Sequence, residues 1–298
     1  MPKLIKSTMH LYGLCLMRLL TIVLMISMAS STVAQKKLPP PSPVQFQNGS
    51  LRYAPDPLGN RVVDFSYAGY KASEVEISSP QVKFLLSPSK QDDAACIQAA
   101  VDAVSNLPLD KNGFRGTVLL QAGTYHIKKS IRIHSSGTVL AGSKGTVLVG
   151  EGIDREPLIN IKGINNKLSS AETMIVDAYV GVGTKQFTIK QTEGFAVGDE
   201  VTIRRPSTLA WIKLLGTDHF GGGVTATGWK PGERDLFFER KITAIDGNKI
   251  TIDHALTTAI DSSYGGAMIS KYEWKGRISN CGVENLTLVS SYALSNPK

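Results

Sequence analysis

The sequence repeats one short motif three times: Gly116-Thr117-Val118-Leu119-Leu120, Gly137-Thr138-Val139-Leu140-Ala141 and Gly145-Thr146-Val147-Leu148-Val149. Other runs of three to five apolar residues lie between and after these copies, and each ends at Gly, Ser or Asn, which is typical of short strands. No helical pattern separates them, although parallel strands normally need a long crossover. A solenoid, in which each coil contributes several strands, provides parallel pairing with short corners only.

The spacing of the copies predicts the length of a coil. The first two copies start 21 residues apart, and the third starts only 8 residues later. The third copy is therefore expected on another face of the same coil. An antiparallel sandwich of hairpins remains the alternative that periodicity alone leaves open.

An amphipathic helix is expected just before the first copy, over residues 93–104. Ile97, Val101 and Val104 fall at helical spacing and form one apolar stripe. The preceding pair Asp92-Asp93 suits the free N–H groups and the dipole of a helix start, so we interpret it as a cap rather than a catalytic pair. The helix is well placed to close the N-terminal end of a solenoid, whose open edge would expose unpaired backbone groups.

Residues 184–260 have a different pattern, with longer alternating runs and a hairpin signal at Asp246-Gly247-Asn248. We interpret this segment as a small antiparallel β insertion carrying a long loop at 205–235, and loops of that length are commonly functional. Solenoid-like runs return over 261–298. Because no capping element follows them, the sequence favours a chain truncated at the C-terminus.

The N-terminal residues 1–34 read as a secretory signal peptide with cleavage after Ala34. An uncleaved anchor is the alternative, although the apolar core is short for a membrane span. Residues 35–45 are rich in proline and predict a linker, and 46–183 would hold an N-terminal cover, the capping helix and the first coils. The protein is thus expected outside the cytoplasm, as a secreted, periplasmic or surface protein without a stable membrane span after cleavage.

Composition narrows the class of partner. The 298 residues include 33 Lys and Arg against 25 Asp and Glu, a formal net charge of +8, and 42% are hydrophobic. This excludes a mainly disordered chain and favours an anionic partner. The basic residues are spread along the chain, so nucleic-acid binding is not expected. Cys96 and Cys281 are too few and too distant for a disulfide framework, and we expect two buried free thiols, with one long-range bridge as the alternative.

The run from Asp92 to Gly142 resembles the N-terminal part of the pectate-lyase-like right-handed β-helix superfamily, which includes pectate lyases, rhamnogalacturonases and polysaccharide epimerases. The resemblance rests on these features of the sequence: the acidic pair 92–93, Ile97-Gln98-Ala99-Ala100, the strand 116–120, Ala122-Gly123-Thr124-Tyr125-His126-Ile127 and Leu140-Ala141-Gly142. It implies an all-β, right-handed parallel β-helix with an N-terminal capping helix. Ala94 and Gln121-Ala122 depart from the usual pattern. The matched motifs are structural, and one fold hosts many functions.

The resemblance also implies a substrate groove on the side of the helix, where two chemistries compete. A lyase removes the proton next to a uronate carboxylate, and needs a base and a cation, often Ca²⁺ held by acidic oxygens. A glycoside hydrolase needs two carboxyl groups across the scissile bond.

The sequence offers candidates for both chemistries. Arg205, Asp218 and His219 are the candidate catalytic residues. The candidate substrate-binding residues are Arg204, Trp211, Trp229, Glu273, Trp274 and Arg277. Arginine binds carboxylates bidentately and tryptophan stacks on sugar rings, but a solvated strand end and core packing explain the same residues. His126 and His134 alternate with apolar residues and are expected to point outward.

We therefore expect a lyase of an acidic polysaccharide, with Ca²⁺ as the one cofactor suggested. A glycoside hydrolase of the same fold and a non-catalytic polysaccharide-binding or surface protein are the alternatives. A groove lined by clustered ionisable residues would separate an enzyme from an empty β-helix.

Overall fold

The computed structural model describes residues 42–152, 156–221 and 227–291. The predicted signal peptide lies outside these residues, as does the predicted linker up to residue 41. All described residues from Pro43 onward belong to one unit. None of the described helices is long and apolar enough to cross a membrane.

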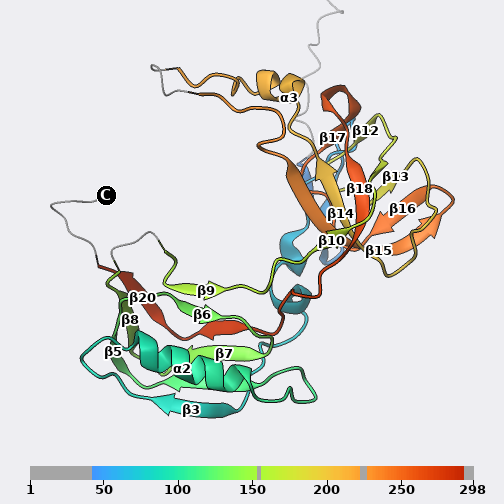
Figure 1. The fold of residues 1–298 in the computed structure, drawn as a ribbon. Coiled ribbons are helices and arrows are strands. Elements are labelled where there is room, and N and C mark those ends of the chain that lie inside the picture. Colours follow the sequence, from blue (N-terminus) through green and yellow to red (C-terminus); the bar gives the residue numbers. More distant parts are fainter. Residues whose placement is uncertain (1–41, 153–155, 222–226, 292–298) are drawn as a thin grey trace, which may run out of the picture. The chain divides into compact units, whose positions relative to one another are not determined.

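The described part of the chain is mostly β-structure (Figure 1). Its strands are β1 (Val44–Gln47), β2 (Ser50–Tyr53), β3 (Val82–Leu86), β4 (Gly116–Leu120), β5 (Gly123–Ile127), β6 (Ile131–Ile133), β7 (Thr138–Gly142), β8 (Thr146–Gly150), β9 (Ile159–Ile161), β10 (Leu168–Ser169), β11 (Thr173–Met174), β12 (Tyr179–Val180), β13 (Gln186–Thr188), β14 (Glu200–Arg205), β15 (Leu236–Asp246), β16 (Lys249–Ile252), β17 (Ile260–Asp261), β18 (Met268–Glu273), β19 (Gly282–Glu284) and β20 (Thr287–Ser290). Its helices are α2 (Ala94–Ser105) and α3 (Leu209–Leu214), with short 3-10 turns at Phe65–Tyr67, Tyr70–Ser73 and Ser262–Tyr264.

The parallel strands form three sheets, and from β4 onward successive parallel strands along the chain belong to different sheets. Strands β3, β4, β7 and β19 form the first sheet, β5, β8 and β20 the second, and β6 and β9 the third. The first two motif copies pair in the first sheet, with Gly116 opposite Thr138, whereas the third copy pairs with β5. The third copy therefore lies in a different parallel sheet from the first two, and parallel pairing excludes the antiparallel sandwich for these strands.

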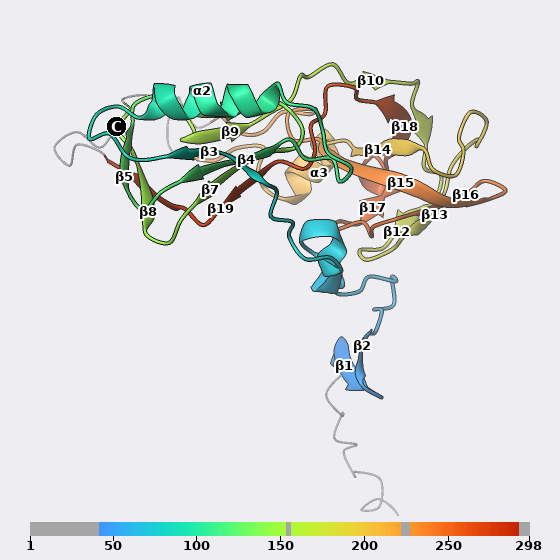
Figure 2. The same ribbon diagram turned by 90° about the horizontal axis from the view of Figure 1, so that it is seen from below.

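Helix α2 covers one side of these sheets, where it contacts β3, β4, β6 and β7 (Figures 1 and 2). Ile97, Val101 and Val104 are buried in the same apolar cluster as Val118 and Leu140, as their helical spacing predicts. Burying an aliphatic side chain contributes about 1.5–3 kcal/mol, so this stripe fixes the helix on the sheets.

Residues of α2 and of the preceding acidic pair form hydrogen bonds with backbone N–H and carbonyl groups at the edges of β5 and β6. The side-chain amide of Gln98 accepts from the Arg132 N–H at 2.8 Å and donates to the Arg132 carbonyl at 3.0 Å, as a neighbouring strand would. The Asp93 N–H donates to the His126 carbonyl at 2.8 Å, and the Asp93 carboxylate accepts from the His126 N–H at 3.2 Å. Edge strands left open invite pairing with other chains, so these contacts explain the cap.

Asp92 has the structural role that the sequence predicts. Its carboxylate accepts from the Ala94 N–H at 3.1 Å, at the start of α2, and from the Lys128 N–H at 3.2 Å beyond β5. The interpretation as a helix cap is confirmed for Asp92. Asp93 occupies the N-cap position of α2, but its carboxylate accepts from the Ser89 and His126 N–H groups and forms no capping hydrogen bond to the helix.

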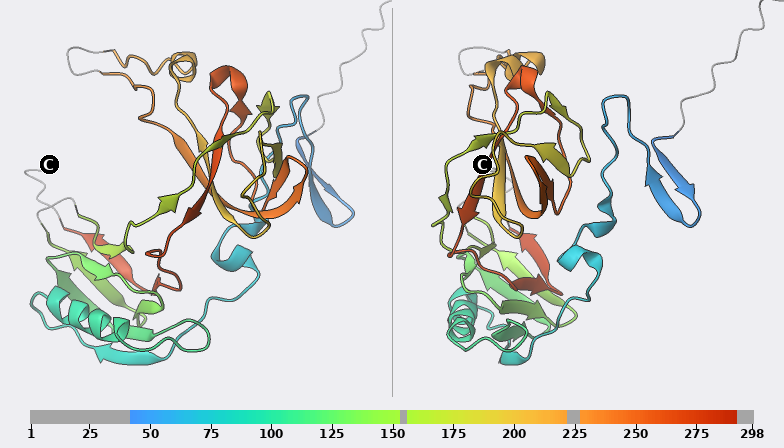
Figure 3. Two further views of the ribbon diagram at one scale, coloured as in Figure 1. Left: turned by 45° about the vertical axis from the view of Figure 1, so that its right-hand side comes forward. Right: turned by 90° about the vertical axis from the view of Figure 1, so that its right-hand side faces the viewer.

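The rest of the described chain forms antiparallel sheets. Strands β10, β18, β14, β15, β16 and β13 lie side by side in this order, with β11 also on β18, and β12 pairs with β17. The gold and orange strands of Figure 3 show this part from two further directions. Its own core includes Phe187, Ile203, Ile250 and Ile269.

Antiparallel pairing extends past both predicted ends of the insertion, 184–260. Strands β10 to β12 precede residue 184, and β18 pairs antiparallel with β14. The segment around 268–273, expected to resume the solenoid, therefore belongs to this part, and parallel pairing resumes only at β19. The physical reason is that Ile269 is buried in the core of the antiparallel strands.

Both cysteines of the described residues are free, as expected. Cys96 is exposed on α2, however, so the expectation that it is buried was wrong, and Cys281 is half-buried.

Candidate functional site

A groove lies over the third parallel sheet, where β6 and β9 run side by side. Both strands alternate apolar and polar residues, and the register sets Arg132 opposite Asn160. Ile131 and Ile133 are buried in the core, so by the period of two the intervening Arg132 and the following His134 face away from it. Lys162 follows β9, and its N–H donates to the Ile133 carbonyl at 3.0 Å.

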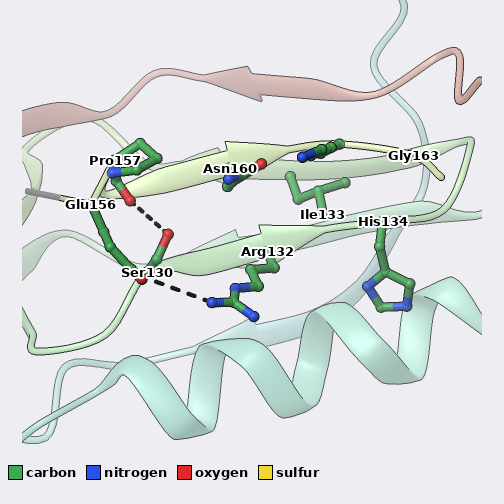
Figure 4. A pocket seen from close by; sticks show the side chains of 9 residues that line it. Ser130, Arg132, Ile133, His134, Glu156, Pro157, Asn160 and Gly163 are labelled. Atoms are coloured by element: carbon green, nitrogen blue, oxygen red, sulfur yellow. Dashed lines mark hydrogen bonds and ion pairs between the residues drawn. The ribbon is translucent and has the colours of Figure 1, made fainter. Parts of the chain in front are cut away.

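The groove contains a cavity of about 390 Å³ (Figure 4). Its lining residues are Ser130, Arg132, Ile133, His134, Glu156, Pro157, Asn160, Lys162 and Gly163. A neighbouring cavity of about 850 Å³ shares part of this lining and adds Lys128 and Lys129. Among the described lining residues of the smaller cavity, Glu156 is the one carboxylate, so cationic groups predominate.

A carboxylate on α2, that of Asp102, lies near His134. Its Nδ1 lies 3.9 Å from the Asp102 Oδ1, and the side chains are 54% and 48% exposed. The same Asp102 oxygen accepts from Gln98 at 2.8 Å, so the capping amide also positions this carboxylate. The Arg132 guanidinium lies 4.0 Å from Glu156, an exposed ion pair that is weak and easily opened (Figure 4).

Of these groove residues, only His134 was considered from the sequence, as an outward-pointing residue. The signal for the others was present in two matching alternations, Ile131-Arg132-Ile133-His134 and Ile159-Asn160-Ile161-Lys162. The outward histidine of β5, His126, instead lies 2.6 Å from Glu151.

The predicted basic pair, Arg204 and Arg205, ends β14. Arg204 is held by two carboxylates: its Nε and Nη2 donate to Glu172 at 2.8 and 2.6 Å, and its Nη1 donates to Asp235 at 3.1 Å. The hydrogen bond to Glu172 contributes most to raising the pKa of Arg204 above its usual value. Arg204 is therefore engaged within the protein and is not available as predicted to bind a uronate.

Arg205 contacts an aromatic cluster instead. Its guanidinium carbon lies 4.7 Å from the centre of the Trp211 ring, and Trp211 stacks on Trp229 at 6.0 Å between ring centres. The structure thus brings three of the predicted residues together. Phe220 and Arg234 join them and were not singled out from the sequence.

Asp218 and His219 are exposed residues of the long loop, and His219 pairs with Thr227 in an isolated antiparallel bridge. Within the described ranges neither side chain forms an ion pair, so the predicted acid/base pair gains no support from geometry.

Trp274 and Arg277 do meet, at 4.7 Å between guanidinium carbon and ring centre, but Glu273 is exposed and is not part of their contacts. Arg277 pairs with Glu239 and donates to the Tyr272 hydroxyl at 3.1 Å. Lys167 also pairs with Glu239, at 2.9 Å. The carboxylate of Glu239 thus pairs with both Lys167 and Arg277, so the charged groups of this cluster bind one another.

Within residues 42–152, 156–221 and 227–291, no group of three or more His, Cys, Asp or Glu side chains is placed to hold a metal ion. The suggested Ca²⁺ stays a prediction.

No protein-family model matches the sequence, and no curated protein matches it either. Solved structures of three tailspikes each align with 67% of this chain. They are Gp54 of Acinetobacter baumannii bacteriophage AP22, in complex with A. baumannii capsular saccharide (13% identity, TM-score 0.36), gp61 of Pseudomonas phage phi297 (13%, 0.37) and gp49 of Pseudomonas phage LKA1 (19%, 0.36). The chain spans 27%, 28% and 32% of their lengths, and the likeness is distant.

Proposed function

We propose that this protein binds an acidic, uronate-containing polysaccharide in the groove over β6 and β9 and cleaves it by β-elimination. The observation that carries the proposal is the outward row of Arg132, His134 and Lys162 around one cavity, with the Asp102 carboxylate near His134. A base beside cations is what elimination next to a carboxylate needs.

Each group has a role in this reaction. Arg132 and Lys162 bind the uronate carboxylate and stabilise the negative charge that develops when the neighbouring carbon loses its proton. His134 takes that proton. The electron pair of the broken C–H bond forms the carbon–carbon double bond as the glycosidic C–O bond breaks, and the leaving oxygen gains a proton from solvent.

Asp102 acts through His134. A carboxylate near Nδ1 favours the tautomer that carries its proton there and leaves Nε2 free to accept a proton. At 3.9 Å this is an electrostatic contact, which we expect to shorten when substrate excludes water from the groove.

We also propose that the three parallel sheets are the faces of a right-handed β-helix. Support comes from the pairing order, because β4, β5 and β6 of one turn pair in sequence with β7, β8 and β9 of the next. Strands β19 and β20 then add to two of these sheets. Secretion through the signal peptide at 1–34 belongs to the same proposal.

The carboxylates argue for elimination over hydrolysis. Among the residues that the structure describes, Glu156 is the one carboxylate lining the smaller cavity, and Asp92, which the larger cavity adds, already accepts from two backbone N–H groups. A glycosidase needs a free pair across the scissile bond.

The experiment uses the secreted chain with polygalacturonate, alginate, hyaluronan and neutral dextran, each with added Ca²⁺ or a chelator. Ultraviolet absorbance follows the unsaturated product, and a reducing-end assay runs beside it. We expect both signals to rise together on at least one acidic polymer and neither on dextran. New ends without absorbance would replace elimination by hydrolysis, and silence across the panel would favour a non-catalytic binding protein.

A further inference from the structure

At the end of β14, two stacked tryptophan rings lie between two guanidinium groups; none of these residues lines the groove. The guanidinium of Arg205 stacks on Trp211, Trp211 stacks on Trp229 with 22° between the ring planes, and the guanidinium of Arg234 lies 5.5 Å from the centre of the Trp229 ring. Phe220 meets Trp229 edge-on at 6.1 Å. We refer to Arg205, Trp211, Trp229 and Arg234 as the Arg–Trp ladder.

The two arginines of the ladder differ from the other arginines of the antiparallel part. Arg204 and Arg277 pair with carboxylates, and Arg240 donates to the carbonyls of His254 and Ala255 at 2.9 Å each. Among the described residues, by contrast, no side-chain hydrogen bond or ion pair is formed by Arg205 or Arg234. Their donors are left for something that is not part of the described chain.

Arg205 is mostly buried although its guanidinium has no hydrogen-bonded partner among the described residues. The residue is only 7% exposed, and burial lowers its pKa against the opposing charge of Asp261. Burial costs a charged group part of its hydration, and an anion that binds the accessible edge of the guanidinium would offset this cost. A guanidinium that stacks by its face keeps its in-plane N–H groups directed outward, in the fork that matches a carboxylate.

The ladder is held in place by one buried hydroxyl. Ser207, 1% exposed, accepts from the N–H groups of Gly232 and Arg234 at 3.0 Å each, and donates to Asp235 at 2.9 Å. Thr208 donates to the Tyr264 carbonyl at 2.8 Å, and the Trp229 N–H donates to the Thr217 carbonyl at 2.8 Å. These bonds fix the backbone at both ends of the long loop, from which the residues of the ladder extend.

We propose that the Arg–Trp ladder is a second binding site, which takes the carboxylate groups of an acidic saccharide. The substrate class rests on the function proposed above. The rings favour a saccharide over an acidic peptide, because Trp211 and Trp229 are half-buried and Phe220 is 53% exposed beside them, which gives apolar surface for the C–H faces of a pyranose.

Tryptophan fluorescence tests this site separately from the groove. The chain contains three tryptophans, so the full chain carrying Trp274→Phe reports on Trp211 and Trp229 alone. It is titrated with oligogalacturonate, with neutral dextran oligosaccharide and with a polyglutamate peptide. We expect saturable quenching by oligogalacturonate that weakens at high salt, and little by dextran or polyglutamate.

Two variants assign the response to the guanidinium groups. Arg234→Ala removes an exposed side chain, and Arg205→Lys keeps the charge but removes the planar pair of N–H donors. Each variant is expected to weaken binding about tenfold or more, because each loses one charge-assisted hydrogen bond to the ligand. The matched control is Arg52→Ala, an exposed arginine of β2, which should leave binding unchanged. Thermal unfolding checks that each variant folds.

The outcomes separate the two proposals. Quenching that persists in His134→Gln, or in a protein without lyase activity, supports the ladder independently of the groove. Absent quenching, equal quenching by dextran, preference for polyglutamate, or full binding by both arginine variants would overturn the ladder proposal even if the groove is active.

Discussion

Arg204 and Arg205 are neighbours in β14, yet they contact opposite kinds of partner. Arg204 is held by Glu172 and Asp235, whereas Arg205 stacks on Trp211 and forms no ion pair with a carboxylate of the described chain. The alternation of a strand explains this, because Arg205 follows the core-facing Val201 and Ile203 and Arg204 faces the other side. Arg204 therefore has a structural role, whereas the guanidinium N–H donors of Arg205 have no hydrogen-bond partner in the described chain.

The first prediction follows from the structural arginine. Arg204→Ala leaves Glu172 and Asp235 without their cation, and we expect the free energy of unfolding to fall by about 1–3 kcal/mol. Urea unfolding measures the change, with Arg52→Ala as the exposed control. Equal stability of the two variants would contradict the role given to Arg204.

Acid pH should remove part of the same stabilisation. Burial acts to raise the pKa of Asp235, but hydrogen bonds from Ser207 and Arg204 outweigh it and hold this pKa below its usual value. Because the folded state has the lower pKa, the stabilisation is complete above the ordinary aspartate pKa of about 3.9 and is lost as pH falls through the folded value. Asp235→Asn should thus be less stable than the native chain at pH 7, and the gap should narrow below about pH 4. Urea unfolding at several pH values measures it; a gap independent of pH would speak against this account.

The cap gives a prediction about the edge of β6. Gln98→Ala leaves the N–H and carbonyl of Arg132 without their partners, so we expect a loss of about 1–2 kcal/mol and faster hydrogen exchange at the Arg132 amide. The exposed Gln191→Ala serves as control and should change stability by less than about 0.5 kcal/mol. Unchanged exchange at Arg132 would show that Gln98 does not protect this edge.

The groove cations should act on both binding and catalysis. Arg132→Ala and Lys162→Ala are each expected to raise KM for an acidic polysaccharide about tenfold, since one charge contact to the substrate carboxylate is lost. Each is also expected to lower kcat, since the negative charge that develops in the transition state is less stabilised. The effect should shrink at high salt, because salt screens exposed charges. Lys249→Ala, in the exposed end of a hairpin, is the matched control, and a KM that does not respond to either groove variant would place binding elsewhere.

Much of the parallel part was predictable from local sequence. The spacing of the motif copies gives the pairing of β4 with β7, and the stripe of Ile97, Val101 and Val104 gives the buried face of α2. Both signals are local, because a strand alternates every two residues and a helix every three to four. The amide of Gln98 on Arg132 could not be predicted in the same way, since it joins residues that are 34 positions apart.

The arrangement of the antiparallel part could not be predicted from local sequence patterns. Strand β18 looks like any other short alternating strand, and only its pairing with β14 assigns it to the antiparallel sheet. Likewise, Trp211 and Trp229 were candidates by residue type alone, and it is the Ser207 hydrogen bonds across the loop that bring Arg234 to them. The partners of Arg204 are equally distant in sequence, so the sequence alone left it a candidate substrate-binding residue.

We propose that the groove over β6 and β9 is catalytic, with His134 as the base. The most direct measurement compares the rate of ultraviolet absorbance increase on the best acidic substrate for the native chain, His134→Gln and the exposed control His254→Gln. The account predicts a fall of about 10²-fold or more in kcat for His134→Gln, with KM little changed, and no change for His254→Gln. A His134→Gln protein with native kcat would contradict the account.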